Sequence, residues 1–149
     1  MVSVLILTLN EECNLPACLE SVKWSDDVVV FDSFSSDRTI EIARASGARV
    51  EQRRFDNYAA QRNAALKVAF RHPWVLMVDA DEVIPEELRQ EVIEQTGLVS
   101  CDIDMFRMRR KDLFFERWLR RSSGYPTWFA RLFRVGHVWV EREINEEMH

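Results

Sequence analysis

Short apolar segments alternate with helical patterns over the first 95 residues, and this order limits the folds open to the chain. The apolar runs cover residues 2–8, 27–31, 49–52 and 74–78, and the helical patterns cover about 14–23, 38–46, 58–70 and 85–95. Apolar runs of this length, bounded by turn-forming residues, are typical of buried strands. Strands that alternate with helices predict an α/β fold of Rossmann-like type, in which helices cover both faces of a mostly parallel sheet.

The later residues have a different pattern. Residues 103–110 partly alternate apolar and polar side chains, residues 112–127 form a basic, aromatic loop, and 128–133 and 137–140 resemble short strands. A chain of 149 residues with 47% hydrophobic and 30% charged residues has the size and composition of one globular domain. We therefore expect a single domain over residues 1–149.

Polar side chains follow three of the predicted strands at the point where each strand ends. In a parallel sheet these ends lie along one edge, where open α/β sheets bind their ligands. The residues expected there are Thr8, Asn10, Glu11, Asp32, Asp79 and Asp81. Magnesium-type ions are commonly held by one or two carboxylates together with substrate phosphates. The Asp-x-Asp pair at 79–81 therefore indicates a site for a divalent cation and a nucleotide.

Each of these carboxylates also has a structural interpretation. Asp79 and Asp81 precede a helix start at Pro85, where acidic residues often serve only the helix terminus. Asp32 stands before a turn, where aspartate is a common capping residue; alternatively, it accepts hydrogen bonds from a base or a ribose hydroxyl. The coincidence of polar residues at three strand ends favours a functional site.

The charge is unevenly distributed. The chain carries a net charge of −5, but residues 107–134 hold eight arginines and one lysine against two acidic residues, which gives +7. Such a segment fits an anionic partner, either a phosphate, an acidic glycan or a membrane surface, or is simply a solvated basic face. No nucleic-acid-binding motif accompanies it, so we expect no nucleic-acid partner. The three cysteines lack metal-ligand spacing, and no membrane span or signal peptide is visible, which predicts a cytoplasmic protein with reduced thiols.

Six segments of the sequence form a recognisable set: residues 2–12, 29–39, 61–66, 74–82 and 131–134, followed by Asn145-Glu146. In their order and spacing they resemble the motifs of family 2 glycosyltransferases, most closely the branch that contains lipopolysaccharide core glycosyltransferases. The resemblance implies a GT-A fold and inverting transfer from a nucleotide-diphosphate sugar, UDP by default, to a glycan or glycolipid acceptor. Residues 1–95 would then bind the nucleotide sugar, and residues 96–149 would form the acceptor side.

The resemblance also implies roles for individual residues. Thr8, Asn10, Glu11 and Asp32 would line the nucleoside pocket, Asp79 would contact the ribose or a metal-bound water, and Asp81 would bind Mn²⁺ or Mg²⁺. Arg62 and Asn63 would lie near that site, or else serve as a surface charge and a capping amide. The branch often has a His-Glu pair where this chain has Asn145-Glu146, so Glu146 is the candidate base. His137 and His149 are the candidates to replace the missing histidine, although a lone histidine is more often a packing or surface residue.

The end of the chain affects the functional hypothesis. It stops three residues after Glu146, so we expect a C-terminally truncated domain with an incomplete acceptor side. The basic loop suits a phosphorylated glycolipid, or else its tryptophans simply pack on the core; its residues are Arg117, Trp118, Arg120, Arg121, Tyr125 and Trp128. The basic region 107–134 would also allow peripheral contact with the inner face of a membrane. The alternative is a non-catalytic nucleotide-binding or assembly module. A nucleotidyltransferase is disfavoured, because residues 8–12 contain no glycine and are acidic.

Overall fold

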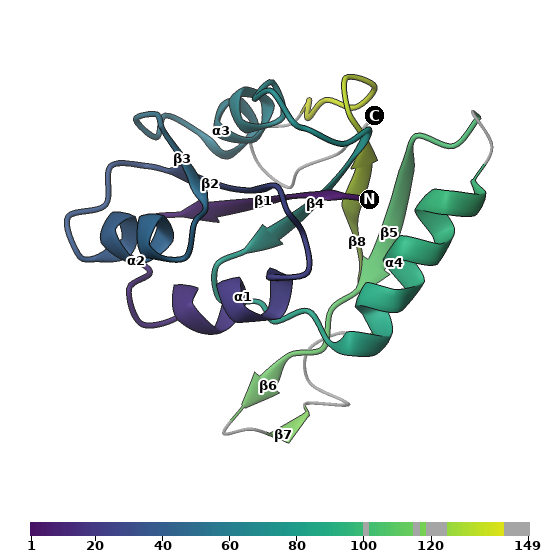
Figure 1. Ribbon diagram of the computed structural model, residues 1–149, viewed down its shortest axis with the longest axis horizontal. Helices are drawn as coiled ribbons and strands as arrows, with labels where there is room; N and C mark the ends of the chain where they lie inside the picture. The colour runs from purple at the N-terminus through teal and green to yellow at the C-terminus, as the bar shows by residue number, and fades with distance from the viewer. Residues whose placement is uncertain (100–101, 115–116, 119–124, 142–149) are drawn as a thin grey trace.

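The computed structural model describes residues 1–99, 102–114, 117–118 and 125–141. Its elements, in chain order, are β1 (Ser3–Thr8), α1 (Leu15–Val22), β2 (Val28–Asp32), α2 (Thr39–Ala45), β3 (Arg49–Gln52), α3 (Tyr58–Ala65), β4 (Trp74–Asp79), α4 (Glu86–Leu98), β5 (Met105–Arg109), β6 (Leu113–Phe114), β7 (Arg117–Trp118) and β8 (Trp128–Arg134). Six strands form one sheet in the order β3-β2-β1-β4-β8-β5, while β6 and β7 pair separately (Figure 1).

The first four strands are parallel, as predicted. β1 lies between β2 and β4, with Thr8 opposite Asp32 and Leu7 opposite Asp79. Because of this register, the carboxyl ends of the three central strands lie side by side. β8 runs antiparallel to β4, and β5 runs antiparallel to β8, so the sheet is mixed but mostly parallel at its centre.

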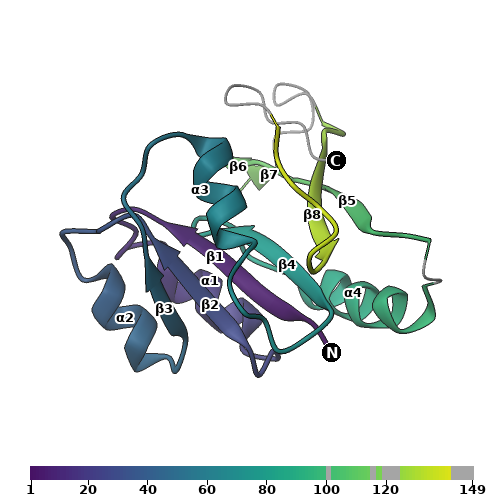
Figure 2. The ribbon, with the colours of Figure 1, turned by 90° about the horizontal axis from the view of Figure 1, so that it is seen from above.

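Helices cover both faces of the sheet. α1, α2 and α4 lie on one face and α3 on the other (Figure 2). Successive strand residues point to opposite faces, so Ile6 and Leu76 pack on the side of α1, whereas Leu5 and Met77 pack on the side of α3. All four side chains are fully or almost fully buried. The predicted α/β fold is therefore confirmed.

The helix predicted over residues 58–70 ends at Ala65. After it, the backbone N–H of Val68 donates to the carbonyl of Ala65. The chain then turns toward the amino edge of the sheet, where the N–H of Arg71 donates to the buried Asp27 carboxylate at 2.8 Å. These donors are bound outside a helical ladder, so the prediction was too long by five residues.

The predicted strand at residues 137–140 is wrong. The chain reverses direction after β8 at Gly136, whose φ is +83°. Val140 lies next to α3, where its backbone N–H and carbonyl bind the Asn63 side chain at 2.8 and 2.7 Å. A side chain therefore satisfies the polar groups that a neighbouring strand would have bound. In the loop predicted over 112–127, β6 and β7 form a short antiparallel pair.

A β-bulge interrupts the pairing of β5 and β8. Phe106 lies opposite Leu132 and Arg107 opposite Ala130, so Arg131 has no partner residue on β5. A bulge adds one residue to a strand and redirects its side chain. The guanidinium of Arg131 lies beside the end of β4, among the carboxylates described next.

Candidate functional site

Asp32 organises the carboxyl ends of β1 and β2. Its carboxylate is fully buried and accepts a hydrogen bond from Thr8 Oγ1 at 2.9 Å. It also accepts from Ser35, through the backbone N–H at 2.9 Å and Oγ at 2.5 Å, and from Gln52 Nε2 at 3.1 Å. Both oxygens are thus bound within the chain, and a nucleoside would contact Asp32 directly only by replacing one of these donors.

Hydrogen bonds join the loop after β1 to the loop after β2. The backbone N–H of Asn10 donates to Ser35 Oγ, and the N–H of Ser36 donates to Asn10 Oδ1, both at 2.8 Å. The N–H of Glu11 donates to Thr39 Oγ1 at 2.8 Å. Asn10 and Glu11 therefore lie at the predicted edge, and their hydrogen bonds hold the two loops beside Asp32.

Asp79, at the end of β4, lies between two arginines. Its Oδ2 accepts a hydrogen bond from Arg131 Nη2 at 2.6 Å, and its Oδ1 is 3.7 Å from Arg62 Nη2. Arg131 Nη2 also donates to Glu82 Oε1 at 2.8 Å, while Glu82 Oε2 accepts from the backbone N–H of Asp79 at 3.1 Å. Arg131 is 8% exposed, while the side chains of Glu82 and Asp79 are 19% and 30% exposed, so the cluster is partly shielded from water.

The cluster changes the proton affinities of its members. Burial alone raises the pKa of Asp79, but the hydrogen bond and charge of Arg131, with the charges of Arg62 and Arg110, lower it below the usual value. Burial raises the pKa of Glu82, and Asp79 adds to the effect more weakly than Arg131 opposes it. Burial, with Glu82 and Asp79, also raises the pKa of the Cys18 thiol to about 12, which makes this cysteine a poor nucleophile.

Asp81 differs from its neighbours. Its side chain is exposed and, within the described residues, makes no hydrogen bond or ion pair. No group of three or more His, Cys, Asp or Glu side chains suited to a metal ion occurs in the part of the chain that is described. The residues present still fit a magnesium-type ion, because such ions are often held by one or two carboxylates plus substrate phosphates. Asp81 is the carboxylate available for that arrangement.

Of the other predicted residues, Arg62 reaches the cluster and Asn63 does not. Asn63 uses both polar atoms of its amide on the backbone of Val140, so it anchors the segment after β8 to α3. Glu146 and His149 lie outside the described residues. His137 forms an ion pair with Asp104 at 2.9 Å. It lies at the opposite edge from Asp81, because β8 runs antiparallel to β4 and ends beside Trp74. The suggestion that His137 replaces the missing histidine is therefore wrong.

The sequence did not identify Glu82 and Arg131 as site residues. Glu82 directly follows the Asp-x-Asp pair, so its position was a usable signal. Arg131 lies 52 residues from Asp79 in the chain. No local pattern shows that β8 lies next to β4, or that a bulge turns Arg131 toward Asp79.

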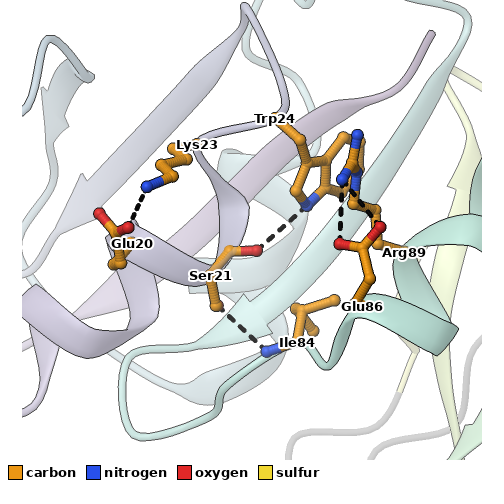
Figure 3. A pocket seen from close by; sticks show the side chains of 7 residues that line it. All are labelled: Glu20, Ser21, Lys23, Trp24, Ile84, Glu86 and Arg89. Carbon is orange, nitrogen blue, oxygen red and sulfur yellow. Dashed lines mark hydrogen bonds and ion pairs between the residues drawn. The ribbon is translucent and has the colours of Figure 1, made fainter.

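A shallow pocket between α1 and α4 lies apart from these residues (Figure 3). It is lined by Glu20, Ser21, Lys23, Trp24, Ile84, Glu86 and Arg89. Lys23 pairs with Glu20, and Arg89 pairs with Glu86 at 2.9 Å. Because its charges are paired and none of the predicted site residues lines it, we do not assign it to the candidate site.

Comparison with known proteins places the chain in a family. The profile of glycosyl transferase family 2 matches residues 3–141, and the chain belongs to that family. It is 37% identical over 92 residues to an uncharacterized glycosyltransferase of Rickettsia typhi, an alignment covering 61% of this chain and 31% of the relative. It is 32% identical over 114 residues to the lipopolysaccharide core biosynthesis glycosyltransferase LpsC of Rhizobium meliloti, covering 73% of this chain and 42% of LpsC. The chain thus spans less than half of either relative.

Solved structures of glycosyltransferases share the fold. S. aureus TarS 1–349, in complex with UDP-GlcNAc, is 30% identical with a TM-score of 0.54, covering 64% of this chain and 31% of TarS. Glucosyl-3-phosphoglycerate synthase from Mycobacterium tuberculosis, in complex with Mn²⁺, UDP and phosphoglyceric acid, is 24% identical with a TM-score of 0.57, covering 70% of this chain and 41% of the synthase. The predicted GT-A fold and the resemblance to family 2 are both confirmed.

Proposed function

We propose that the chain is the donor-binding part of an inverting glycosyltransferase that moves a sugar from a nucleotide-diphosphate sugar to a glycan or glycolipid. One observation carries this proposal: β4 ends at Asp79, which is held by arginines, and the exposed Asp81 follows two residues later. Both lie at the edge where the loops of β1 and β2 meet. UDP-GlcNAc bound to the similar TarS supports a UDP-sugar as donor.

The predicted site residues have different proposed roles at this edge of the sheet. Thr8, Asn10, Glu11 and Asp32 shape the loops beside the nucleoside, and Asp79 faces the ribose. Asp81 binds Mn²⁺ or Mg²⁺, which when bound neutralises the charge that develops on the departing diphosphate. The guanidinium of Arg62, 3.7 Å from Asp79, adds fixed positive charge beside the same group. Mn²⁺ in the complex of the mycobacterial synthase supports the choice of metal.

Transfer to the acceptor requires a base for its attacking hydroxyl and a protein surface that binds it. Glu146 remains our proposed base, which takes the proton from the attacking hydroxyl. Charged and aromatic side chains of the acceptor half support a phosphorylated glycolipid: Arg109 lies 5.3 Å from the ring centre of Trp128, and Lys111 lies 5.1 Å from that of Trp118. Trp128 is 54% exposed, so its ring can stack on a sugar.

Peripheral contact with a membrane belongs to the same proposal. Leu113, in the β6–β7 pair, is 66% exposed, and Arg109, Lys111 and Arg117 nearby in sequence are exposed. Within the described residues, no helix is both long and apolar enough to cross a bilayer. Basic side chains attract anionic lipid surfaces, and the membrane surface we propose is the inner, cytoplasmic face. The similarity to LpsC, a lipopolysaccharide core biosynthesis glycosyltransferase, supports an acceptor of the lipopolysaccharide type.

A panel of nucleotides tests the donor site. We expect UDP, but not GDP, ADP or CMP, to raise the melting temperature in the presence of Mn²⁺, with a smaller rise in EDTA. A ligand at one hundred times its Kd adds about 2.7 kcal/mol, which corresponds to several degrees for a domain of this size. If none of the four nucleotides raises the melting temperature with Mn²⁺, the proposed donor site is wrong.

The alternative is a non-catalytic module that binds the nucleotide without transferring sugar. The two functions differ in turnover: release of UDP from UDP-GlcNAc in the presence of phosphorylated glycan acceptors supports the enzyme. UDP binding without any release supports the module.

A further inference from the structure

Arg131 contacts two carboxylates at once, and a β-bulge in β8 places it beside them. It is the residue that the β-bulge adds to β8, and pairing between β4 and β8 stops at Leu132. One nitrogen, Nη2, lies 2.6 Å from Asp79 Oδ2 and 2.8 Å from Glu82 Oε1. The Arg131 side chain is 9% exposed and its partners Asp79 and Glu82 are 30% and 19% exposed, so water screens these contacts only in part.

The segment Asp79–Glu82 contains three carboxylates in different states. Arg131 pairs with both Asp79 and Glu82, and the remaining oxygen of Glu82 accepts a hydrogen bond from the backbone N–H of Asp79. Asp81, between them in sequence, is exposed and makes no hydrogen bond or ion pair within the described residues. In this arrangement one carboxylate of the three is available to a cation.

We propose that Arg131 is a positioning residue of the donor site. It pairs with Asp79 and Glu82 and thereby confines a divalent cation to Asp81. The proposal rests on the proposed donor function. One exposed carboxylate holds Mn²⁺ weakly, and oxygens of the diphosphate supply the further ligands that such an ion needs. Arg131 therefore makes tight binding of the ion depend on the nucleotide, and by linkage the ion strengthens nucleotide binding by the same factor.

The test is a Mn²⁺ titration of the protein and its R131Q variant, with and without UDP, followed by the paramagnetic resonance signal of free Mn²⁺. In the parent we expect weak binding without UDP and much tighter binding with it. R131Q removes one positive charge, releases Glu82 from its ion pair and leaves Asp79 with its longer, 3.7 Å contact to Arg62. Its Mn²⁺ affinity without UDP should therefore rise by roughly tenfold or more. The ratio of affinities with and without UDP should fall. An R131Q variant that folds but binds Mn²⁺ no more tightly than the parent without UDP overturns the proposal.

The rise in affinity separates this role from a structural one, because general damage to the site lowers affinity. R134Q is the matched control: Arg134 is also in β8, pairs with Asp104 at 3.2 Å, and lies at the opposite edge of the sheet. Its Mn²⁺ affinity should equal that of the parent under both conditions. A rise in R134Q equal to that in R131Q would also contradict the proposal.

E82Q keeps the test decisive if R131Q does not fold. Arg131 and Asp79 remain paired in this variant, so it retains the main charge pair of the cluster. Because Glu82 serves Arg131 and not the ion, Mn²⁺ affinity in the presence of UDP should stay within about threefold of the parent. A greater loss makes Glu82 a metal ligand and overturns the proposal. If the parent itself binds no Mn²⁺ in the presence of UDP, the proposed function fails, independently of Arg131.

Discussion

Phe34 adopts a backbone conformation that costs energy. Its φ is +63°, in the left-handed region where a bulky side chain is rarely found, and its ring is 53% exposed. The residue follows Asp32 and Ser33, in the loop whose Ser35 binds the Asp32 carboxylate. The hydrogen bonds of that loop therefore impose the conformation, and strain of this kind is often found beside functional sites.

Glycine and alanine at position 34 isolate this strain. Both variants lose the ring and its contact with Arg54, 5.9 Å from the ring centre, and only glycine tolerates a positive φ without penalty. We expect F34G to be about 1 kcal/mol more stable than F34A in urea unfolding. The same pair at Glu91, an exposed position inside α4, should show the opposite order. Equal stability of F34G and F34A would mean that the loop carries no strain.

At the residue scale, the sequence predicted where the site residues lie better than it predicted which groups they bind. Thr8, Asp32 and Asp79 could be placed at one edge because strand ends can be recognised from where apolar runs stop. That Gln52 binds Asp32 and Arg131 binds Asp79 depends on contacts between distant segments. A local pattern contains no information about such contacts.

The connection between α3 and β4 depends on the buried Asp27. Its carboxylate accepts hydrogen bonds from Ser3 Oγ at 2.6 Å, the backbone N–H of Arg71 at 2.8 Å and Arg49 Nη2 at 2.8 Å. Three segments thus meet at one side chain, at the amino edge of the sheet. Burial alone raises the pKa of Asp27, but these donors together lower it below the usual value.

We expect D27N to lose about 2–4 kcal/mol of unfolding free energy at neutral pH, because an amide cannot replace all of these contacts in a buried site. Since the folded pKa is the lower one, the carboxylate stabilises the fold above the pKa of the unfolded chain, about 3.9, and this contribution is lost as the pH falls through the folded pKa. The difference between parent and D27N should therefore shrink below about pH 4.

Urea unfolding at pH 7 and pH 3 measures both effects. D26N is the matched control, because the neighbouring Asp26 is exposed and pairs with His72 at 2.6 Å. Its effect at pH 7 should be clearly smaller than that of D27N. A D27N difference that is unchanged or larger in acid would contradict the role assigned to Asp27.

At the scale of elements, the apolar pattern predicted whether a segment is a helix or a strand better than it predicted where that element ends. The four parallel strands and the helices between them were predicted correctly, because each is set mainly by its own apolar pattern. The end of α3 and the path of residues 137–140 were not predicted correctly, because side chains from other segments determine both. Asp27 binds the backbone that follows α3, and Asn63 binds the backbone of Val140. The bulge at Arg131 likewise has no signal in β8 alone.

The molecule as a whole combines an ordinary α/β core with two antiparallel strands that return to it. β8 inserts beside β4 (Figure 1). Its Arg131, from the basic segment, thereby reaches the acidic end of β4. The strand order could not be predicted, because strands joined by long connections pair through contacts far apart in sequence. The class of fold could be predicted, because it follows from the order of elements alone.

The most direct test of the donor site is UDP binding to the parent and to D81N, measured by calorimetry in Mn²⁺ and in EDTA. Asp81 is exposed and makes no hydrogen bond or ion pair within the described residues, so its substitution should not disturb the fold. We expect the parent to bind UDP at least about tenfold more tightly in Mn²⁺, and D81N to lose this advantage while its affinity in EDTA is unchanged. E87Q, which alters an exposed carboxylate of α4, should behave as the parent. Mn²⁺-dependent UDP binding retained in full by D81N would contradict the assignment of the metal to this edge of the sheet.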